Sequence, residues 1–277
     1  MGESWIAAPE QALATGWERD TPSDDTLVRS FVDGWSDMSE AVALGLGGRV
    51  IRDDTLMAAD GASPGAYANS AVLLAPLTES SAADTASRLT RFYAEGTGGS
   101  WMLFSATPTP DLRPYGLHLV GHPPLMFRPP GGEAPAPPPG IEIVEVTDDE
   151  LLVTFERTCI EGYPMPELAD APPPCLLPDA VLTDPAFRMW IGVVDGEPSA
   201  TSMAHVGDGM SHVEWVSAKQ AVRGRGYGAA ITWPSTLIRA DVPSLLIASD
   251  DGRPVYDRMG YLPLTRFTVW MGSRSES

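Results

Sequence analysis

The sequence predicts an α/β protein of two domains, each with a mixed, mostly antiparallel central sheet flanked by helices. The chain has 277 residues, enough for two domains of ordinary size. Its content of 43% hydrophobic and 20% charged residues is typical of a packed core. A proline-rich stretch at 129–140 divides the chain almost in half. Proline fixes φ and cannot donate a hydrogen bond, so we expect an extended linker between domains at 1–128 and 141–277.

The charge balance excludes several classes of partner. Lys and Arg number 18 against 37 Asp and Glu, for a net charge of -19. A duplex nucleic-acid binder or an anionic-membrane binder would need basic surfaces, so we expect neither partner. The composition, rich in Arg, Gly, Pro and Ala, is typical of a GC-rich bacterial genome.

The cysteines and the N-terminus narrow the class further. Two cysteines, Cys159 and Cys175, are too few for a four-cysteine zinc site or a disulfide framework, and we expect no metal. Met1–Glu10 lacks a basic segment followed by an apolar one, and the chain has no apolar run long enough to span a membrane. We therefore expect a cytoplasmic protein.

The second half begins with a strand and a helix. Residues 141–146 alternate apolar and acidic side chains, which is typical of a half-buried strand. Thr147 and Glu150 have the spacing of a capping box, which predicts a helix start. The apolar face of that helix would consist of Leu151, Leu152, Phe155, Cys159 and Ile160. Cys159 is therefore predicted to be a core residue and not a nucleophile.

The rest of the second half predicts three strands in a meander, then a helix, a strand, a short helix and a last strand. Asp195-Gly196 and 207–209 are hairpin signals between the three strands. We place these elements at 189–194, 199–206, 210–216, 226–240, 244–249, 253–259 and 262–271. Pro234 should bend or end the longer helix.

The first half repeats this pattern more faintly. Strands are predicted at 49–59, 67–74 and 100–106, helices at 82–93 and 111–120, and a strand end at 124–128. Two features recur about 140 residues apart. The strand 100–106 matches 244–249, and Arg113-Pro114-Tyr115 with Gly121 resembles the stretch from Arg253 to Gly260. We interpret this as a duplicated domain.

A glycine-rich turn after the third strand of the meander carries the chemistry. Gly224, Gly226 and Gly228 alternate at the start of a helix, where close backbone approach and free amides suit a pyrophosphate. Lys219, Arg223 and Arg225 add positive charge to this turn in an otherwise acidic chain. The same stretch also satisfies the dinucleotide fingerprint G-x-G-x-x-A, with Asp250 at the end of a later strand. The context argues against a dinucleotide-binding fold, because the turn follows an antiparallel meander and the rest of the chain has room for only one more βαβ unit.

The second half resembles the GNAT (GCN5-related) N-acetyltransferases. Their loop [RQ]-x-x-G-x-[GA] is filled by Arg223, Gly226 and Gly228, after a strand that ends in Val216-Ser217-Ala218. Their next block is matched by Ser249, Gly252, Tyr256 and Gly260-Tyr261. The asparagine that the family often has after its fifth strand is absent, and Ser249 or Asp250 occupies that position. The resemblance covers 141–277 and extends more loosely to 1–128, which would be a degenerate, non-catalytic copy. It implies transfer of an acetyl group from acetyl-CoA to a primary amine by direct attack.

The resemblance also implies which residues would act. The backbone of 216–218 would pair with the pantetheine arm, and amides of 224–229 would bind the pyrophosphate. The implied acetyl-CoA-binding residues are Val216, Ser217, Ala218, Arg223, Gly224, Arg225, Gly226, Tyr227, Gly228, Ala229 and Ser249. Tyr256 would be the acid that protonates the leaving thiolate. By the period of two, His212, Glu214 and Val216 share one face of their strand, and we take Glu214 as the first candidate base and His212 as the second.

The acceptor site and the role of the first half follow from the same resemblance. The apolar segment 162–187 lies where the family binds its acceptor, and the acidic charge would favour a cationic acceptor, most simply a small-molecule amine. The first half has no glycine turn between Leu74 and Ala82, so we expect it to bind no acyl-CoA and to wall the acceptor site. We expect a monomer or a homodimer. The alternative function is a sensory or regulatory protein that binds acyl-CoA without turnover.

Overall fold

The computed structural model describes residues 26–96, 99–163 and 165–273, which form two compact units. Of the described residues, those up to 125 and those from 263 to 273 form the first unit, and those between 126 and 262 form the second. The expectation about Met1–Glu10 lies outside the described residues. Within the described part, no helix combines the length and the apolar character that a membrane crossing needs.

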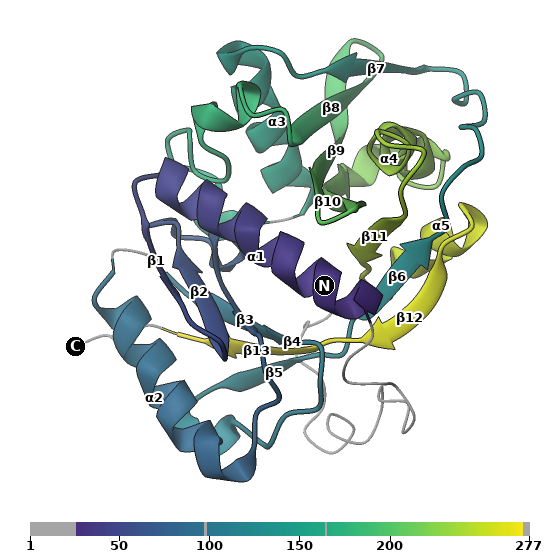
Figure 1. Ribbon diagram of the computed structural model, residues 1–277. Helices are drawn as coiled ribbons and strands as arrows, with labels where there is room; N and C mark the ends of the chain where they lie inside the picture. The colour runs from purple at the N-terminus through teal and green to yellow at the C-terminus, as the bar shows by residue number, and fades with distance from the viewer. Residues whose placement is uncertain (1–25, 97–98, 164, 274–277) are drawn as a thin grey trace. The chain divides into compact units, whose positions relative to one another are not determined.

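The first unit contains a six-stranded sheet in the order β1-β2-β3-β4-β13-β5 (Figure 1). Its strands are β1 (Arg49–Arg52), β2 (Leu56–Asp60), β3 (Asn69–Leu73), β4 (Trp101–Ser105), β5 (His118–Gly121) and β13 (Thr268–Gly272). Only the β3–β4 pair is parallel among these neighbours. The mixed, mostly antiparallel sheet predicted from the sequence is therefore confirmed here.

Two helices cover the two faces of this sheet. Trp35 of α1 (Thr26–Gly45) packs edge to face on Phe104, with ring centroids 4.8 Å apart. Leu89 of α2 (Glu79–Ala94) belongs to a buried cluster with Leu103. Because adjacent strand residues point to opposite faces, α1 and α2 lie on opposite sides of β4. Two single turns, η1 (Ala66–Ala68) and η2 (Arg113–Tyr115), complete the unit.

The second sheet has seven strands in the order β12-β6-β11-β10-β9-β8-β7. They are β6 (Pro124–Arg128), β7 (Ile141–Glu145), β8 (Phe187–Val194), β9 (Glu197–Gly207), β10 (Met210–Ala218), β11 (Ser244–Ile247) and β12 (Leu262–Arg266). The helices are α3 (Asp149–Gly162), α4 (Tyr227–Thr236) and α5 (Arg253–Arg258), with single turns η3 (Pro166–Leu168), η4 (Asp179–Leu182) and η5 (Gln220–Val222). The β7–β10 meander is antiparallel, and β10 pairs with β11 in parallel.

The two sheets exchange their last strands. β13, from the end of the chain, lies between β4 and β5, and β6, from the first half, lies between β11 and β12 (yellow and teal in Figure 1). The orders β3-β4-β13-β5 and β10-β11-β6-β12 are therefore equivalent, which agrees with the predicted duplication. The expected domains, 1–128 and 141–277, do not coincide with the compact units, because residues 263–273 cluster with the first unit.

The exchange corrects the predicted last strand. A single strand over 262–271 was wrong: β12 ends at Arg266, and β13 begins at Thr268 in the other sheet. Phe267, which is buried, lies between them, and its amide donates to the carbonyl of Pro123 over 2.9 Å. Hydrophobic patterning predicts one continuous strand because β12 and β13 are both sheet strands. The pattern does not show that they belong to different sheets.

Two local predictions in the first half are also wrong, and one helix was not predicted. Residues 111–120 form one turn and a strand, because Gly116 ends the turn in the left-handed region at φ 83°. The strand expected at 49–59 is a hairpin, since Asp53 accepts hydrogen bonds from the amides of Thr55 and Leu56. No element was assigned to α1, although Phe31 and Trp35 are buried at helical spacing.

The second half follows the prediction more closely. Apart from the last strand, its predicted strands and helices are present, with ends shifted by a few residues. The cap of α3 is Asp148, whose carboxylate accepts from the Leu151 amide over 2.9 Å, and not Thr147. α4 ends at Thr236, two residues after Pro234. Cys159 is fully buried, as predicted, and burial raises the pKa of its thiol to about 12.

Candidate active site

Strand β10 separates from β11 after a short parallel contact. The register pairs only Ser211 with Ser244 and His212 with Leu245. On its other edge β10 remains paired with β9 as far as Ala218. Among the described residues, the edge of β10 beyond His212 is therefore not paired with β11, and its backbone can accept an extended ligand.

A β-bulge interrupts β10 where it leaves β11. The pairing with β9 shifts between Glu214 and Ser217, and Trp215 adopts φ 50°, a conformation uncommon for residues other than glycine. The Thr201 hydroxyl donates to the Trp215 carbonyl over 2.8 Å, which stabilises the bulge. The inserted residue turns the strand and changes the direction of the side chains that follow.

The bulge corrects the predicted face of β10. The expectation that Val216 shares a face with His212 and Glu214 is wrong, because Val216 packs with Val213 against the buried cluster that contains Tyr256. A period of two holds only for an uninterrupted strand. Nothing in the local sequence marks the bulge.

Glu214 has a carboxylate that the protein partly covers. The residue is half-buried, but its Oε1 atom is inaccessible and has no hydrogen-bond partner in the part of the chain that the structure describes. Burial raises the pKa of this carboxyl to about 8. A carboxyl group that titrates near neutral pH suits a general base.

His212, the second candidate, lies deeper than Glu214. It is 0% exposed, and its ring lies 5.7 Å from that of His205. Burial, together with the charge of His205, lowers the pKa of His212 to about 3. A fully buried imidazole is a poor acceptor for a substrate proton, so the geometry favours Glu214 over His212.

Tyr256 lies on α5 inside an apolar cluster with Val213, Leu246 and Ala248. Burial, then the neighbouring Tyr261 and the charge of Glu214, raise the pKa of Tyr256 well above its usual value. Its hydroxyl thus stays protonated at neutral pH.

The neighbouring Tyr261 differs from Tyr256 in its bonding. Its hydroxyl is bonded to the hydroxyls of Thr236 and Ser244, at 2.8 and 2.7 Å. Among the described residues, no partner bonds the Tyr256 hydroxyl. Tyr256 is therefore the one of the two that can donate to a ligand.

The glycine turn leaves the start of α4 open. Gly226 precedes the helix in the left-handed region at φ 82°, and as a glycine it has no side chain that could cap the amides that follow. A Cβ atom on Gly224 or Gly228 would meet nothing within 4 Å. In the first unit, by contrast, Ser81 and Thr78 form a capping box at the start of α2. An open start with free amides suits a phosphate group.

The basic residues of the turn have separate contacts. Arg223 donates through Nε to the Ala218 carbonyl and through Nη2 to the Gly162 carbonyl, each over 3.0 Å. Lys219 forms an ion pair with Glu161 at 2.6 Å. Arg225 is exposed. Lys219 and Arg223 therefore hold the turn in place, and Arg225 is the side chain left to face an anion.

Ser249 caps α5. Its hydroxyl accepts a hydrogen bond from the Gly252 amide over 3.0 Å. A Cβ atom on Gly252 would lie 3.1 Å from Ser249 Oγ and 3.3 Å from Tyr256 Cε2, so glycine permits this close packing. Ser249 thus orients the helix that carries Tyr256.

A buried carboxylate in α3 was missed by sequence reasoning. Glu156 is 1% exposed and accepts hydrogen bonds from the amides of Cys175, Leu176 and Leu177. It fastens the segment 162–187 to α3. The signal was available, because Glu156 lies within the apolar face of that helix.

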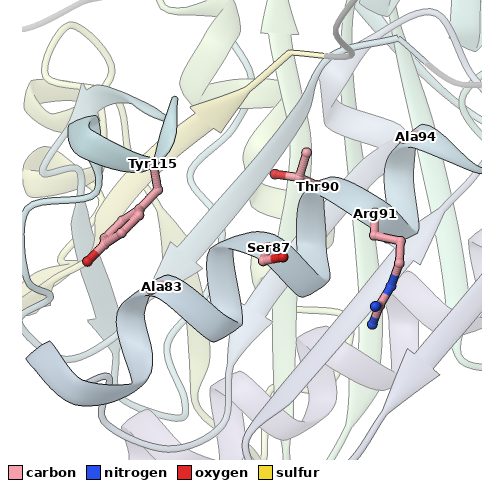
Figure 2. Close-up of a pocket in the computed structure, with 6 residues that line it drawn as sticks. All are labelled: Ala83, Ser87, Thr90, Arg91, Ala94 and Tyr115. Atoms are coloured by element: carbon pink, nitrogen blue, oxygen red, sulfur yellow. The ribbon is translucent and has the colours of Figure 1, made fainter.

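A groove of about 440 Å³ lies on the first unit, between α2 and the turn that carries Tyr115 (Figure 2). Its lining consists of Ala83, Ser87, Thr90, Arg91, Ala94 and Tyr115. These residues include one cationic side chain and no carboxylate. The candidate site is therefore placed in the second unit.

Solved structures share this fold. A GCN5-related N-acetyltransferase from Kribbella flavida is 21% identical, with a TM-score of 0.57 over 86% of this chain and 95% of that one. A conserved protein of unknown function from Staphylococcus epidermidis is 11% identical, with a TM-score of 0.57 over 85% and 99%. A GCN5-related N-acetyltransferase-like protein from Streptococcus suis is 12% identical, with a TM-score of 0.50 over 81% and 88%.

The chain thus has the fold of the GCN5-related N-acetyltransferases. Each of its two sheets is mixed and flanked by helices, as the sequence predicts. No protein-family model and no curated protein matches the sequence.

Proposed function

We propose that the protein is an N-acetyltransferase that moves an acetyl group from acetyl-CoA to a small primary amine. The observation that carries this proposal is the opening of β10 from β11 beside Glu214 and Tyr256. Within the described residues, a strand edge not paired with β11, a carboxyl group that could act as base and a tyrosine hydroxyl that could act as acid occur there in one unit.

The residues of the second unit fit an acyl-CoA. The open start of α4, with space at Gly224 and Gly228, would hold the pyrophosphate through backbone amides and Arg225. The free edge of 216–218 would pair with the pantetheine amides. The co-substrate would supply the acetyl thioester.

Two side chains of this chain would move protons. Glu214 would accept a proton from the attacking amine, directly or through water, because its raised pKa makes it basic near neutral pH. Tyr256 would donate its proton to the departing thiolate, because its hydroxyl stays protonated and has no described partner. In this arrangement the reaction proceeds by direct attack and needs no covalent intermediate on the enzyme.

The test is thiol release from acetyl-CoA in the presence of pooled primary amines. Wild-type protein should release CoA, and Tyr256→Phe should slow release at least about tenfold while acetyl-CoA affinity by calorimetry is kept. Tight acetyl-CoA binding without turnover on any amine would instead support an acyl-CoA sensor. Absence of acetyl-CoA binding would overturn both.

A further inference from the structure

We propose that Tyr261 is a positioning residue of the candidate site, which holds the ring of Tyr256 in the orientation that proton donation needs. The inference deepens the proposed function, in which Tyr256 is the acid, and rests on it for the chemistry. Its test includes a spectroscopic measurement that does not depend on transfer.

The hydroxyl of Tyr256 has no bond within the described residues that could orient it. The side chain is 8% exposed and packs among Val213, Leu246 and Ala248, which offer only apolar contacts. A general acid must direct its proton at the leaving atom, and small displacements of such a group slow the reaction. The direction of this hydroxyl is therefore set by the groups that pack against its ring.

The end of α5 brings Tyr261 against that ring. Gly260 adopts φ 86°, and its amide donates to the carbonyl of Asp257 over 3.2 Å. The amide of Tyr261 donates to the carbonyl of Tyr256 over 3.0 Å. These two bonds form a Schellman motif, in which the residue after the glycine commonly packs on the residue five positions earlier. Here one ring packs on another: the centroids of Tyr256 and Tyr261 are 5.8 Å apart, and their planes are inclined by 65°.

Tyr261 is itself held by its hydroxyl group. The residue is 1% exposed, and its hydroxyl is bonded to those of Thr236 and Ser244. The Thr236 hydroxyl donates its own proton to the Thr232 carbonyl over 2.9 Å, so it accepts in its bond with Tyr261. Ser244 then donates to Tyr261, and each hydroxyl proton in the chain is used. A buried network that is satisfied in this way is rigid.

The direction of these bonds also shows that Tyr261 is not a second acid. Its hydroxyl proton is committed to Thr236 inside the protein, whereas the proton of Tyr256 has no acceptor among the described residues. Tyr261 can therefore influence proton transfer only through Tyr256, whose ring it contacts.

Tyr261 ties Tyr256 to two elements of the candidate site. Thr236 ends α4, the helix whose open start would hold the pyrophosphate. Ser244 begins β11, and its register partner is Ser211, within the short contact between β10 and β11. One side chain thus fixes the proposed acid relative to both the glycine turn and the opening of the sheet.

The test is Tyr261→Phe, which removes the hydroxyl and keeps the ring. With the amine on which the wild type is most active, kcat should fall about tenfold while the KM for acetyl-CoA stays within about twofold, because the orientation of the acid affects the chemical step and not binding. Tyr93→Phe is the control: it removes another buried tyrosine hydroxyl, which donates to the Ala59 carbonyl in the first unit, and should leave kcat unchanged. An unchanged kcat in Tyr261→Phe would overturn the proposal, as would an equal fall in both variants. Circular dichroism of each variant confirms that it is folded.

Fluorine NMR separates this proposal from the proposed function. With 3-fluorotyrosine incorporated, the resonance of Tyr256 is the one that is lost in Tyr256→Phe. In Tyr261→Phe this resonance should split or broaden, because the ring is no longer held in one orientation, and in Tyr93→Phe it should stay unchanged. If it splits or broadens while no amine is acetylated, the positioning contact stands and only the transferase assignment fails. If it remains a single line as sharp as in the wild type, the proposal is overturned whatever the transfer assay gives.

Discussion

The guanidinium of Arg223 donates to the carbonyl of Gly162, 61 residues earlier, over 3.0 Å. A second donor, Nε, reaches the Ala218 carbonyl. One side chain thus joins the glycine turn, the end of β10 and the end of α3. The sequence motif predicts a ligand for this arginine, whereas the described contacts are with the protein's own backbone.

Arg223→Lys should destabilise the protein by about 1 kcal/mol, because an ammonium group cannot make both bonds from one position. Urea unfolding measures this. Arg225→Lys is the control: Arg225 is exposed on the same turn, and its replacement should leave the midpoint unchanged. Equal midpoints for the two variants would show that the Arg223 bonds contribute nothing.

The rate of transfer should follow the ionisation of Glu214. Because the base must be deprotonated, kcat/KM should rise with pH and level off above about 8, the raised pKa of this carboxyl. Glu214→Gln should lose most activity and the ascending limb together. The acceptor in this test is an amine of low pKa, so that its own ionisation does not shape the profile. If kcat/KM of the wild type were already independent of pH at pH 6, Glu214 would be excluded as the base.

Glu214 should also make stability depend on pH. Its pKa in the folded protein, about 8, lies above the ordinary value of 4.5, so between these values the folded state holds a proton that the unfolded state releases. Stability should therefore fall as pH rises through this window. Between pH 5.5 and 7.5 the wild type should lose about 2 kcal/mol more than Glu214→Gln in urea unfolding. Parallel losses would contradict the burial of this carboxyl.

Gly228→Asp should separate binding from folding. The position is open and lies in the first turn of α4, where a carboxylate is favoured, so the melting temperature should stay the same or rise. Acetyl-CoA affinity should fall at least about tenfold, because the new carboxylate competes with the pyrophosphate. The control, Ala180→Asp, adds the same charge at an exposed position of η4 and should leave affinity unchanged. Unchanged affinity in Gly228→Asp would remove the phosphate site from this turn.

Glu156→Gln should be strongly destabilising, by about 2–4 kcal/mol, because an amide NH₂ would face buried backbone donors that a carboxylate accepts. Thermal and urea unfolding measure it, with the exposed Glu167→Gln in the same segment as control. A loss no larger than that of the control would mean that water or a shifted backbone replaces the carboxylate.

The sequence alone determined the features that depend on local patterns. Alternation placed the β7–β10 meander, and alternate glycines located the open start of α4. The spacing from Arg223 to Tyr256 indicated the fold that solved structures share. Such patterns lie within a few residues of one another, so a single window of sequence contains them.

Only the tertiary structure decided which strands pair and which side chains meet. β6 and β13 are apolar strands that suit either sheet, and their exchange depends on partners more than 100 residues away. The bulge at Trp215 depends on the β9 register and the Thr201 hydroxyl, which no motif in β10 encodes. Strand pairing and register are non-local, because they are fixed by contacts between segments far apart in the chain.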